Sequence, residues 1–235
     1  METSQNPISQ KRGCELGDIW SYSVDFEIIL VRADIEQVNF ALAEIFNGLI
    51  EADIDIQESG DKLHALVFQF QGHSWTSFLF FTHRDNLAQK VSEHLKTKCI
   101  HFGYGDTTGW AEYTLYQIGE RAEAYAFGTN YSEEEVPEWA QDTDGFQDEP
   151  VHEFNRSWNL IVTTSDESTR HKFFSVKRRA TSTEIQNPDQ FLDTLFKEQD
   201  AWLPTLKYWF SPEFDPEPDS KLFLQVSKIA YKAII

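Results

Sequence analysis

Apolar residues recur at helix and strand spacings in the first half of the chain, and this periodicity limits the folds open to it. Seven apolar side chains follow helical spacing between residues 35 and 49, and Asp34 stands at the expected N-cap. A helix with one apolar stripe must bury that stripe, most simply against a sheet. Strands are predicted before it over residues 19–31, and after it over residues 52–56 and 63–70.

The order strand, helix, strand, strand recurs further along the chain, over residues 75–81, 87–95, 99–104 and 110–118. A further strand is expected over residues 121–127. Asp85 is expected to cap the helix, and Gly119-Glu120 to form a type II′ turn with Gly at its first position. We interpret residues 19–70 and 74–128 as a candidate internal repeat within one α+β unit, residues 19–128.

The rest of the chain divides into an arm, a connecting segment and a smaller C-terminal part. Residues 1–18 are polar and predicted to form a flexible arm, and residues 129–155 connect the first unit to residues 156–235. The last part contains a hairpin pattern over residues 157–179, a helix start at Asn187-Pro188 and a final strand over residues 222–226. Hairpins outnumber strand–helix alternations. The sequence therefore predicts an α+β fold, with a mainly antiparallel sheet, helices packed on one face and the C-terminal α+β part packed on the first unit.

Negative charge is distributed very unevenly along the chain. The formal net charge is −19, and residues 129–155 hold nine Asp or Glu and no Lys or Arg. Residues 156–235 hold eleven acids and eleven bases. This concentration of carboxylates repels nucleic-acid phosphates, so we expect no binding of DNA or RNA.

The acidic segment has two interpretations, a solvated linker or a recognition segment for a basic protein. The second is suggested by apolar side chains among the acids, since apolar groups supply affinity while carboxylates steer a basic partner. The candidate partner-binding residues are Glu133, Glu134, Glu135, Trp139, Asp142, Asp144, Phe146 and Asp148. The leading prediction is a non-enzymatic protein of inhibitor, immunity or adaptor type that binds a basic protein partner through acidic loops.

An alternative interpretation is a hydrolase-type enzyme. Its site would contain His73, His101, Asp106 and Glu112, provided that these side chains converge on one sheet face. The histidines lack the spacing of a chelating motif, and the glycine-rich loop at residues 103–109 joins two strands instead of leading into a helix. We therefore expect no metal and no cofactor.

Cysteine content and hydropathy indicate the compartment. Cys14 and Cys99 fit neither a disulfide framework nor a metal knuckle, so both are predicted to be reduced thiols. There is no apolar run long enough to span a bilayer, and the N-terminal residues lack the apolar core of a signal peptide. The sequence thus predicts a cytoplasmic protein that does not associate with membranes.

Overall fold

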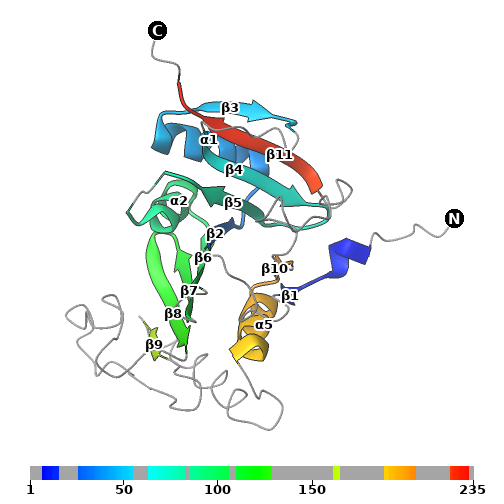
Figure 1. Cartoon of the computed structure of the whole chain (residues 1–235), viewed down its shortest axis with the longest axis vertical. Helices are drawn as coiled ribbons and strands as arrows, with labels where there is room; N and C mark the ends of the chain where they lie inside the picture. The colour runs from blue at the N-terminus through cyan, green and yellow to red at the C-terminus, as the bar shows by residue number, and fades with distance from the viewer. Residues whose placement is uncertain are drawn as a thin grey trace, which may run out of the picture.

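The structure, a computed structural model, describes residues 7–15, 26–54, 63–82, 85–105, 110–128, 161–164, 188–204 and 223–232 (Figure 1). The described helices are the 3-10 helix η1 (Pro7–Gln10) and the α-helices α1 (Ile35–Phe46), α2 (Leu87–Leu95) and α5 (Pro188–Glu198). The described strands are β1 (Gly13–Cys14), β2 (Phe26–Val31), β3 (Leu49–Ala52), β4 (Leu63–Phe70), β5 (Thr76–Phe80), β6 (Lys98–Gly105), β7 (Trp110–Gln117), β8 (Glu120–Gly128), β9 (Ile161–Thr164), β10 (Trp202–Leu203) and β11 (Phe223–Ala230). Within these ranges no helix has the length and apolar character needed to cross a membrane.

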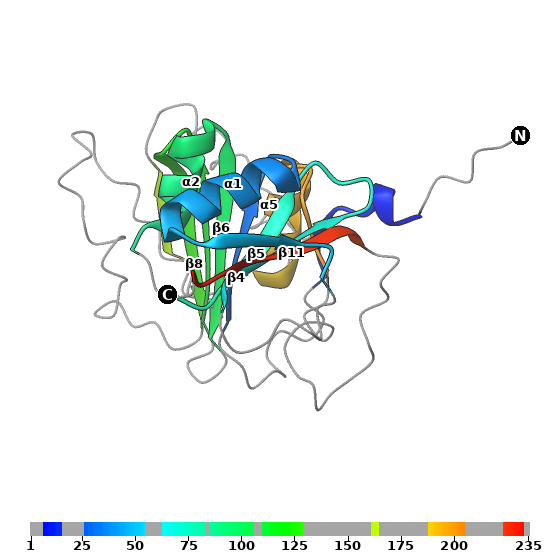
Figure 2. The ribbon, with the colours of Figure 1, turned by 90° about the horizontal axis from the view of Figure 1, so that it is seen from above.

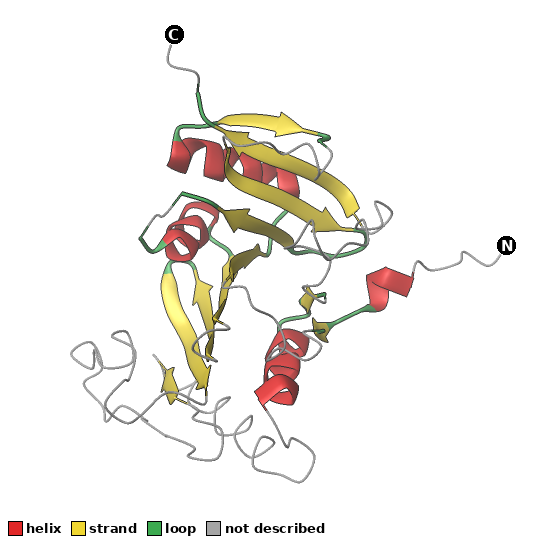
Figure 3. Ribbon diagram, in the orientation of Figure 1, coloured by secondary structure: helices red, strands yellow, loops and turns green. Residues whose placement is uncertain are grey.

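One large antiparallel sheet organises the molecule (Figure 3). Nine of the described strands form it in the order β3-β11-β4-β5-β2-β6-β7-β8-β9, and each neighbouring pair is antiparallel. The two short strands β1 and β10 form a separate parallel pair. This arrangement confirms the predicted α+β class with a mainly antiparallel sheet.

The C-terminal strand β11 occupies an interior position in the sheet. It pairs with β3 through Ser227–Ala230 and with β4 through most of its length. In the second strand–helix–strand–strand segment the corresponding strands, β6 and β7, pair with each other directly. The order β2-α1-β3-β4 is therefore repeated as β5-α2-β6-β7 along the chain, but β11 lies between β3 and β4 in space. Whether the two segments superpose stays a prediction.

Helices α1 and α2 lie next to each other on one face of the sheet (Figure 2). Their apolar stripes pack against the strands beneath them, as the helical spacing of their apolar residues predicts. We call the resulting cluster the helix-face core. It contains Ile29, Val31, Ile35, Val38, Leu42, Phe46, Ala65, Val67, Phe78, Leu87, Ala88, Val91, Cys99 and Ile229.

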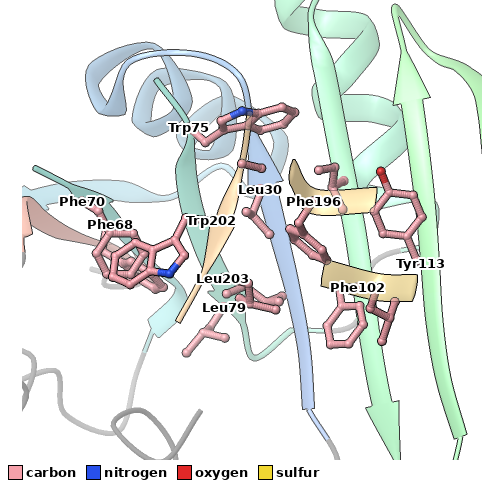
Figure 4. Close-up of a cluster of buried hydrophobic side chains, with 14 of the residues drawn as sticks. Leu30, Phe68, Phe70, Trp75, Leu79, Phe102, Tyr113, Phe196, Trp202 and Leu203 are labelled. Carbon is pink, nitrogen blue, oxygen red and sulfur yellow. The ribbon is translucent and has the colours of Figure 1, made fainter. Parts of the chain in front are cut away.

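The opposite face of the sheet is covered by α5 and the residues that follow it, which form the α5-face core with the strands (Figure 4). Phe196 of α5 is fully buried, and its ring makes edge-to-face contacts with Phe102 and Tyr113, at centroid distances of 5.9 and 5.6 Å. Trp202 lies against Phe70, with ring centroids 4.8 Å apart. Burial of one such aromatic side chain stabilises the fold by roughly 1.5–3 kcal/mol. The two faces of the sheet thus carry separate apolar cores.

Residues 7–15, part of the segment predicted to be a flexible arm, make backbone hydrogen bonds to the residues that follow α5. Gly13 N–H donates to Ala201 O and Glu15 N–H donates to Leu203 O, both at 2.8 Å. Cys14 N–H donates to the Asp193 carboxylate on α5, at 3.2 Å. The pairing of β1 with β10 uses backbone hydrogen bonds, so the side-chain composition of this polar segment does not reveal it. The described part of the N-terminal arm is a strap held against α5 and β10.

Two local expectations require correction. Helix α1 begins after Asp34, as predicted, and Asp34 N–H donates to Gln37 Oε1 at 3.4 Å. Helix α2, however, is preceded at its N-cap by Asn86 in the left-handed region, with φ 56°, and not by Asp85. Asn adopts this region more readily than most residues.

The β7–β8 turn also differs from the prediction. Gln117 pairs with Glu120, which leaves Ile118 and Gly119 as the two turn residues, with φ of 54° and 81°. Positive φ at both positions is typical of a type I′ turn, and Gly occupies the second position instead of the first position of a type II′ turn. The sequence pattern placed the turn one residue too late.

Candidate functional site

The acidic segment lies outside the described residues. All eight candidate partner-binding side chains, Glu133, Glu134, Glu135, Trp139, Asp142, Asp144, Phe146 and Asp148, fall within this undescribed range. The strands at its two ends are described, because β8 ends at Gly128 and β9 begins at Ile161, and Ala126 pairs with Ile161. Residues 129–160, which include the segment, therefore connect two strands that are neighbours in one sheet.

His73 is buried in the α5-face core. It follows β4, its side chain is 7% exposed, and its ring stacks on Trp202 with centroids 5.2 Å apart. The ring also meets Phe70 edge to face at 6.2 Å. The backbone carbonyl of His73 accepts a hydrogen bond from Gln69 Nε2 at 2.9 Å. These contacts are those of a packing residue on the face covered by α5.

His101 lies on the other face of the sheet, the one that carries α1 and α2. Its ring is 6.3 Å from Phe80, which packs against the helix-face core. Its Nε2 atom lies 3.5 Å from Glu27 Oε2, which is ion-pair distance when the imidazole is protonated. The same Nε2 atom is buried and makes no hydrogen bond within the described part of the chain.

Glu112 lies on the same face as His101. In the sheet register Glu27 of β2 and Glu112 of β7 both pair with Gly103 of β6, two residues beyond His101. Directly paired residues and residues two apart in a strand share a face. Because Gly103 has no side chain, no side chain separates the Glu27 and Glu112 positions on this face, and His101 lies two residues away on the same strand. We call Glu27, His101, Gly103 and Glu112 the β6 polar group.

Two of the four residues of the predicted hydrolase site, His101 and Glu112, share a face of the sheet. His73 packs on Phe70 and Trp202 on the opposite face, and Asp106 is outside the described residues. A site containing both histidines is not formed, since the sheet separates them. A carboxylate beside an imidazole can hold the ring and exchange a proton with it, which is the chemistry that the β6 polar group offers.

Glu27 was not among the residues singled out from the sequence. Its position depends on the pairing of β2 with β6, in which Glu27 pairs with Gly103, a residue far away in the sequence. No local pattern reveals such a register. Among the described His, Cys, Asp and Glu side chains, no group of three or more is arranged to hold a metal ion.

A further set of polar side chains lies where β11 ends. His64 is buried between Phe46, stacked at 4.9 Å, and Tyr231, tilted at 3.9 Å. Its Nδ1 atom is 3.0 Å from Thr82 Oγ1, which is itself 2.9 Å from the Tyr231 hydroxyl. This chain of hydrogen bonds anchors the residue that follows β11, so its role is structural.

The two cysteines differ in environment. Cys99 lies fully buried in the helix-face core, and Cys14 is partly exposed in the N-terminal strap. Burial raises the pKa of the Cys99 thiol above its ordinary value, and a side-chain hydrogen bond with Ser92 opposes this only in part. A thiol held protonated by burial is a poor nucleophile.

Comparisons of the chain with protein-family models, with curated proteins and with solved structures gave no match.

Proposed function

We propose that this chain is a non-enzymatic cytoplasmic protein that binds a basic protein partner through its acidic segment, as an inhibitor, immunity-type or adaptor protein does. The observation that carries this proposal is the charge distribution. Residues 129–155 contain nine carboxylates and no Lys or Arg, within a chain of net charge −19. Such a segment attracts a basic surface and raises the rate of encounter with it.

The strands on either side of residues 129–160 belong to one sheet, which is also what a linker that connects two parts of one fold would show. Here β8 and β9 pair in the same sheet, and β11, near the C-terminus, lies in that sheet as well. Anchoring both ends of a segment lowers the conformational entropy that it loses on binding.

The apolar residues of the segment give the proposal its specificity. Trp139 and Phe146 stand among the acids, and a central aromatic side chain commonly contributes most to the affinity of an interface. Glu133, Glu134 and Glu135 would steer the partner. Their contribution should weaken as salt rises, because the Debye length is only about 8 Å at physiological ionic strength.

The proposal is tested by capture of partners from the lysate of the native host. Wild type, Trp139→Ala and the triple variant Glu133→Gln, Glu134→Gln, Glu135→Gln are compared, and captured proteins are identified by mass spectrometry. The Trp139→Ala change is expected to cost about 2 kcal/mol, a roughly 30-fold loss of affinity for the basic partner. The triple Gln variant should bind more weakly at low salt than wild type.

Matched controls remove an aromatic side chain or three carboxylates at exposed positions outside the acidic segment. Phe81→Ala removes an exposed aromatic side chain, and a second triple variant neutralises the exposed Glu93, Glu120 and Glu198. Both controls should retain the partner. Identical partner lists from all five proteins would mean that the acidic segment takes no part in recognition.

A second candidate, a hydrolase, is favoured by one observation, the contact between His101 and Glu27 beside Glu112. It predicts turnover of chromogenic ester or phosphodiester substrates that is lost in His101→Gln. Equal rates for wild type and His101→Gln would rule out this site as the source of any hydrolysis.

A further inference from the structure

The N-terminal strap, residues 7–15, pairs with a short strand that stands outside the large sheet. Strand β1 runs parallel to β10, with Gly13 opposite Trp202 and Cys14 opposite Leu203. Neither strand pairs with any other described strand, and α5 lies beside them (Figure 1). We expect a pair only two residues long to open more readily than the nine-stranded sheet.

The place where the strap lies is anchored to the sheet by residues outside the strap. Trp75 Nε1 donates to Gln199 O at 3.2 Å, and Lys98 Nζ donates to Gln199 Oε1 at 2.9 Å. The Trp202 ring of β10 stacks on His73, with centroids 5.2 Å apart. These contacts connect the end of α5 and β10 to the sheet, so β10 should keep its position when the strap leaves.

The backbone of the strap fits this place closely. Two backbone hydrogen bonds join it to β10, and Cys14 N–H donates to the Asp193 carboxylate at 3.2 Å. A Cβ built on Gly13 would lie 2.0 Å from Asp193 Oδ1, at a φ of +99°, so this position requires glycine. Asp193 already pairs with Lys197 at 2.6 Å, so its carboxylate serves the strap as a hydrogen-bond acceptor and adds little attraction for positive charge.

Two basic side chains of the strap meet complementary groups. Arg12 forms an ion pair with Asp200, and Lys11 Nζ lies 5.2 Å from the centroid of the Trp202 ring. A cation over the face of an indole ring is attracted to it. Lys11 also pairs within the strap with Glu15, at 3.2 Å. We call β10 together with Asp193 and Asp200 the strap seat; it fits an extended Lys-Arg-Gly segment.

We propose that the strap is an autoinhibitory segment, which occupies a preformed strand-binding site for an extended basic segment of the partner protein. A Lys-Arg-Gly segment of the partner would pair with β10 in place of β1, with its Arg on Asp200 and its Gly against Asp193. The strap itself displays this binding mode. Repulsion between copies of net charge −19 disfavours a second copy as the occupant. The proposal rests on the proposed function, since it names a second contact for the same basic partner.

The strap competes with any added segment because it belongs to the same chain. A segment tethered through a short connection commonly has an effective concentration in the millimolar range. The apparent affinity of an added segment is lowered by the fraction of molecules whose seat is open. Wild type should therefore bind such a segment weakly, and variants with a released strap should bind it more tightly.

The test measures fluorescence anisotropy of a labelled synthetic peptide of residues 7–15, under reducing conditions, with the full-length protein. Gly13→Ala and Arg12→Glu change the strap and leave the strap seat unaltered. The matched control Lys90→Glu reverses a charge at an exposed position of α2. A control peptide carries Ala in place of the glycine that corresponds to Gly13.

The peptide should bind Gly13→Ala and Arg12→Glu at least about ten-fold more tightly than it binds wild type and Lys90→Glu. The Ala peptide should bind the strap variants at least about ten-fold more weakly than the Gly peptide. Adding Asp200→Asn to Gly13→Ala should weaken binding about two- to five-fold, as loss of one exposed ion pair does. Asn tolerates the left-handed backbone of residue 200, whose φ is 55°. Circular dichroism melts establish that each variant is folded, and Arg12→Glu provides the answer if Gly13→Ala is not.

Equal binding by wild type and both strap variants would overturn the autoinhibitory role, and no binding by either strap variant would overturn the seat. Equal binding of the Gly and Ala peptides, or no effect of Asp200→Asn, would mean that the peptide is held elsewhere by charge alone. Dimers of wild type that are lost in Arg12→Glu, measured by light scattering, would assign the seat to a second copy and overturn the proposed occupant.

Failure of the proposed function looks different, because wild type would then capture no basic protein in the host-lysate experiment. Capture that depends on Trp139 but is equal for wild type, Gly13→Ala and Asp200→Asn would leave the proposed function standing and refute the strap seat.

Discussion

Replacement of Gly119 by Ala should strongly destabilise the fold, because this glycine joins the β7–β8 turn to helix α2. Gly119 N–H donates to Ser92 Oγ at 3.1 Å, and Gln89 Nε2 donates to Gly119 O at 2.9 Å. Its φ is 81°, and a Cβ built there would lie 2.9 Å from Cβ and 3.3 Å from Cγ of Glu93. The Glu93 Cβ belongs to the rigid part of its side chain and cannot rotate away.

The magnitude follows from three contributions. The left-handed conformation costs a residue with a Cβ about 1–2 kcal/mol. The crowding against Glu93 costs a further 1–3 kcal/mol or so, as overpacking typically does. The lower entropy of the unfolded chain returns about 0.4–1 kcal/mol. The net expectation is a loss of roughly 2–3 kcal/mol, which for a chain of this size lowers Tm by about 4–12 °C.

The assay is urea unfolding followed by circular dichroism, with thermal melts alongside. Gly119→Asn separates the two costs, because Asn tolerates the left-handed region but still crowds Glu93. Its loss should lie between those of wild type and Gly119→Ala. Combining Gly119→Ala with Glu93→Gly removes the side chain that is crowded, so the part of the lost stability that is due to crowding should return. A Gly119→Ala protein within about 0.5 kcal/mol of wild type, a typical neutral surface change, would refute the reasoning.

Two further predictions concern the N-terminal strap and the buried thiol. In Gly13→Ala the new Cβ would lie 2.0 Å from Asp193 Oδ1, at a backbone φ of +99°, so the strap should detach from α5. Trypsin should then cleave after Lys11 or Arg12 at least about ten-fold faster than in wild type, because local opening exposes the chain. Unchanged cleavage, measured by mass spectrometry, would contradict this prediction. Burial raises the pKa of Cys99, so the unfolded thiol ionises first and the free energy of unfolding should fall as pH rises above about 8.5. The fall reaches at most about 1.4 kcal/mol per pH unit and should be lessened in Cys99→Ala between pH 8.5 and 10. An equal slope in both proteins would show that Cys99 is not its source.

Local chemistry in the sequence was sufficient to predict several of the helices and strands, but it did not predict η1 or β1, and the strand expected over residues 52–56 lies at Leu49–Ala52. The strand at Leu63–Phe70 and the helix at Leu87–Leu95 have the predicted bounds, and α5 begins at Pro188 as its start signal indicates. These elements depend on apolar periodicity and terminal residues, which act over a few positions of the chain. The charge of the acidic segment is likewise a property of the sequence alone.

Tertiary structure decided everything that depends on distant pairing. The insertion of β11 between β3 and β4, the strap on α5 and the contact of Glu27 with His101 each join residues far apart in the chain. It also placed His73 and His101 on opposite faces, so the histidines that the sequence grouped together were separated. Strand register and face are fixed by which apolar side chains the two cores bury, and this selection takes place only when the whole sheet assembles.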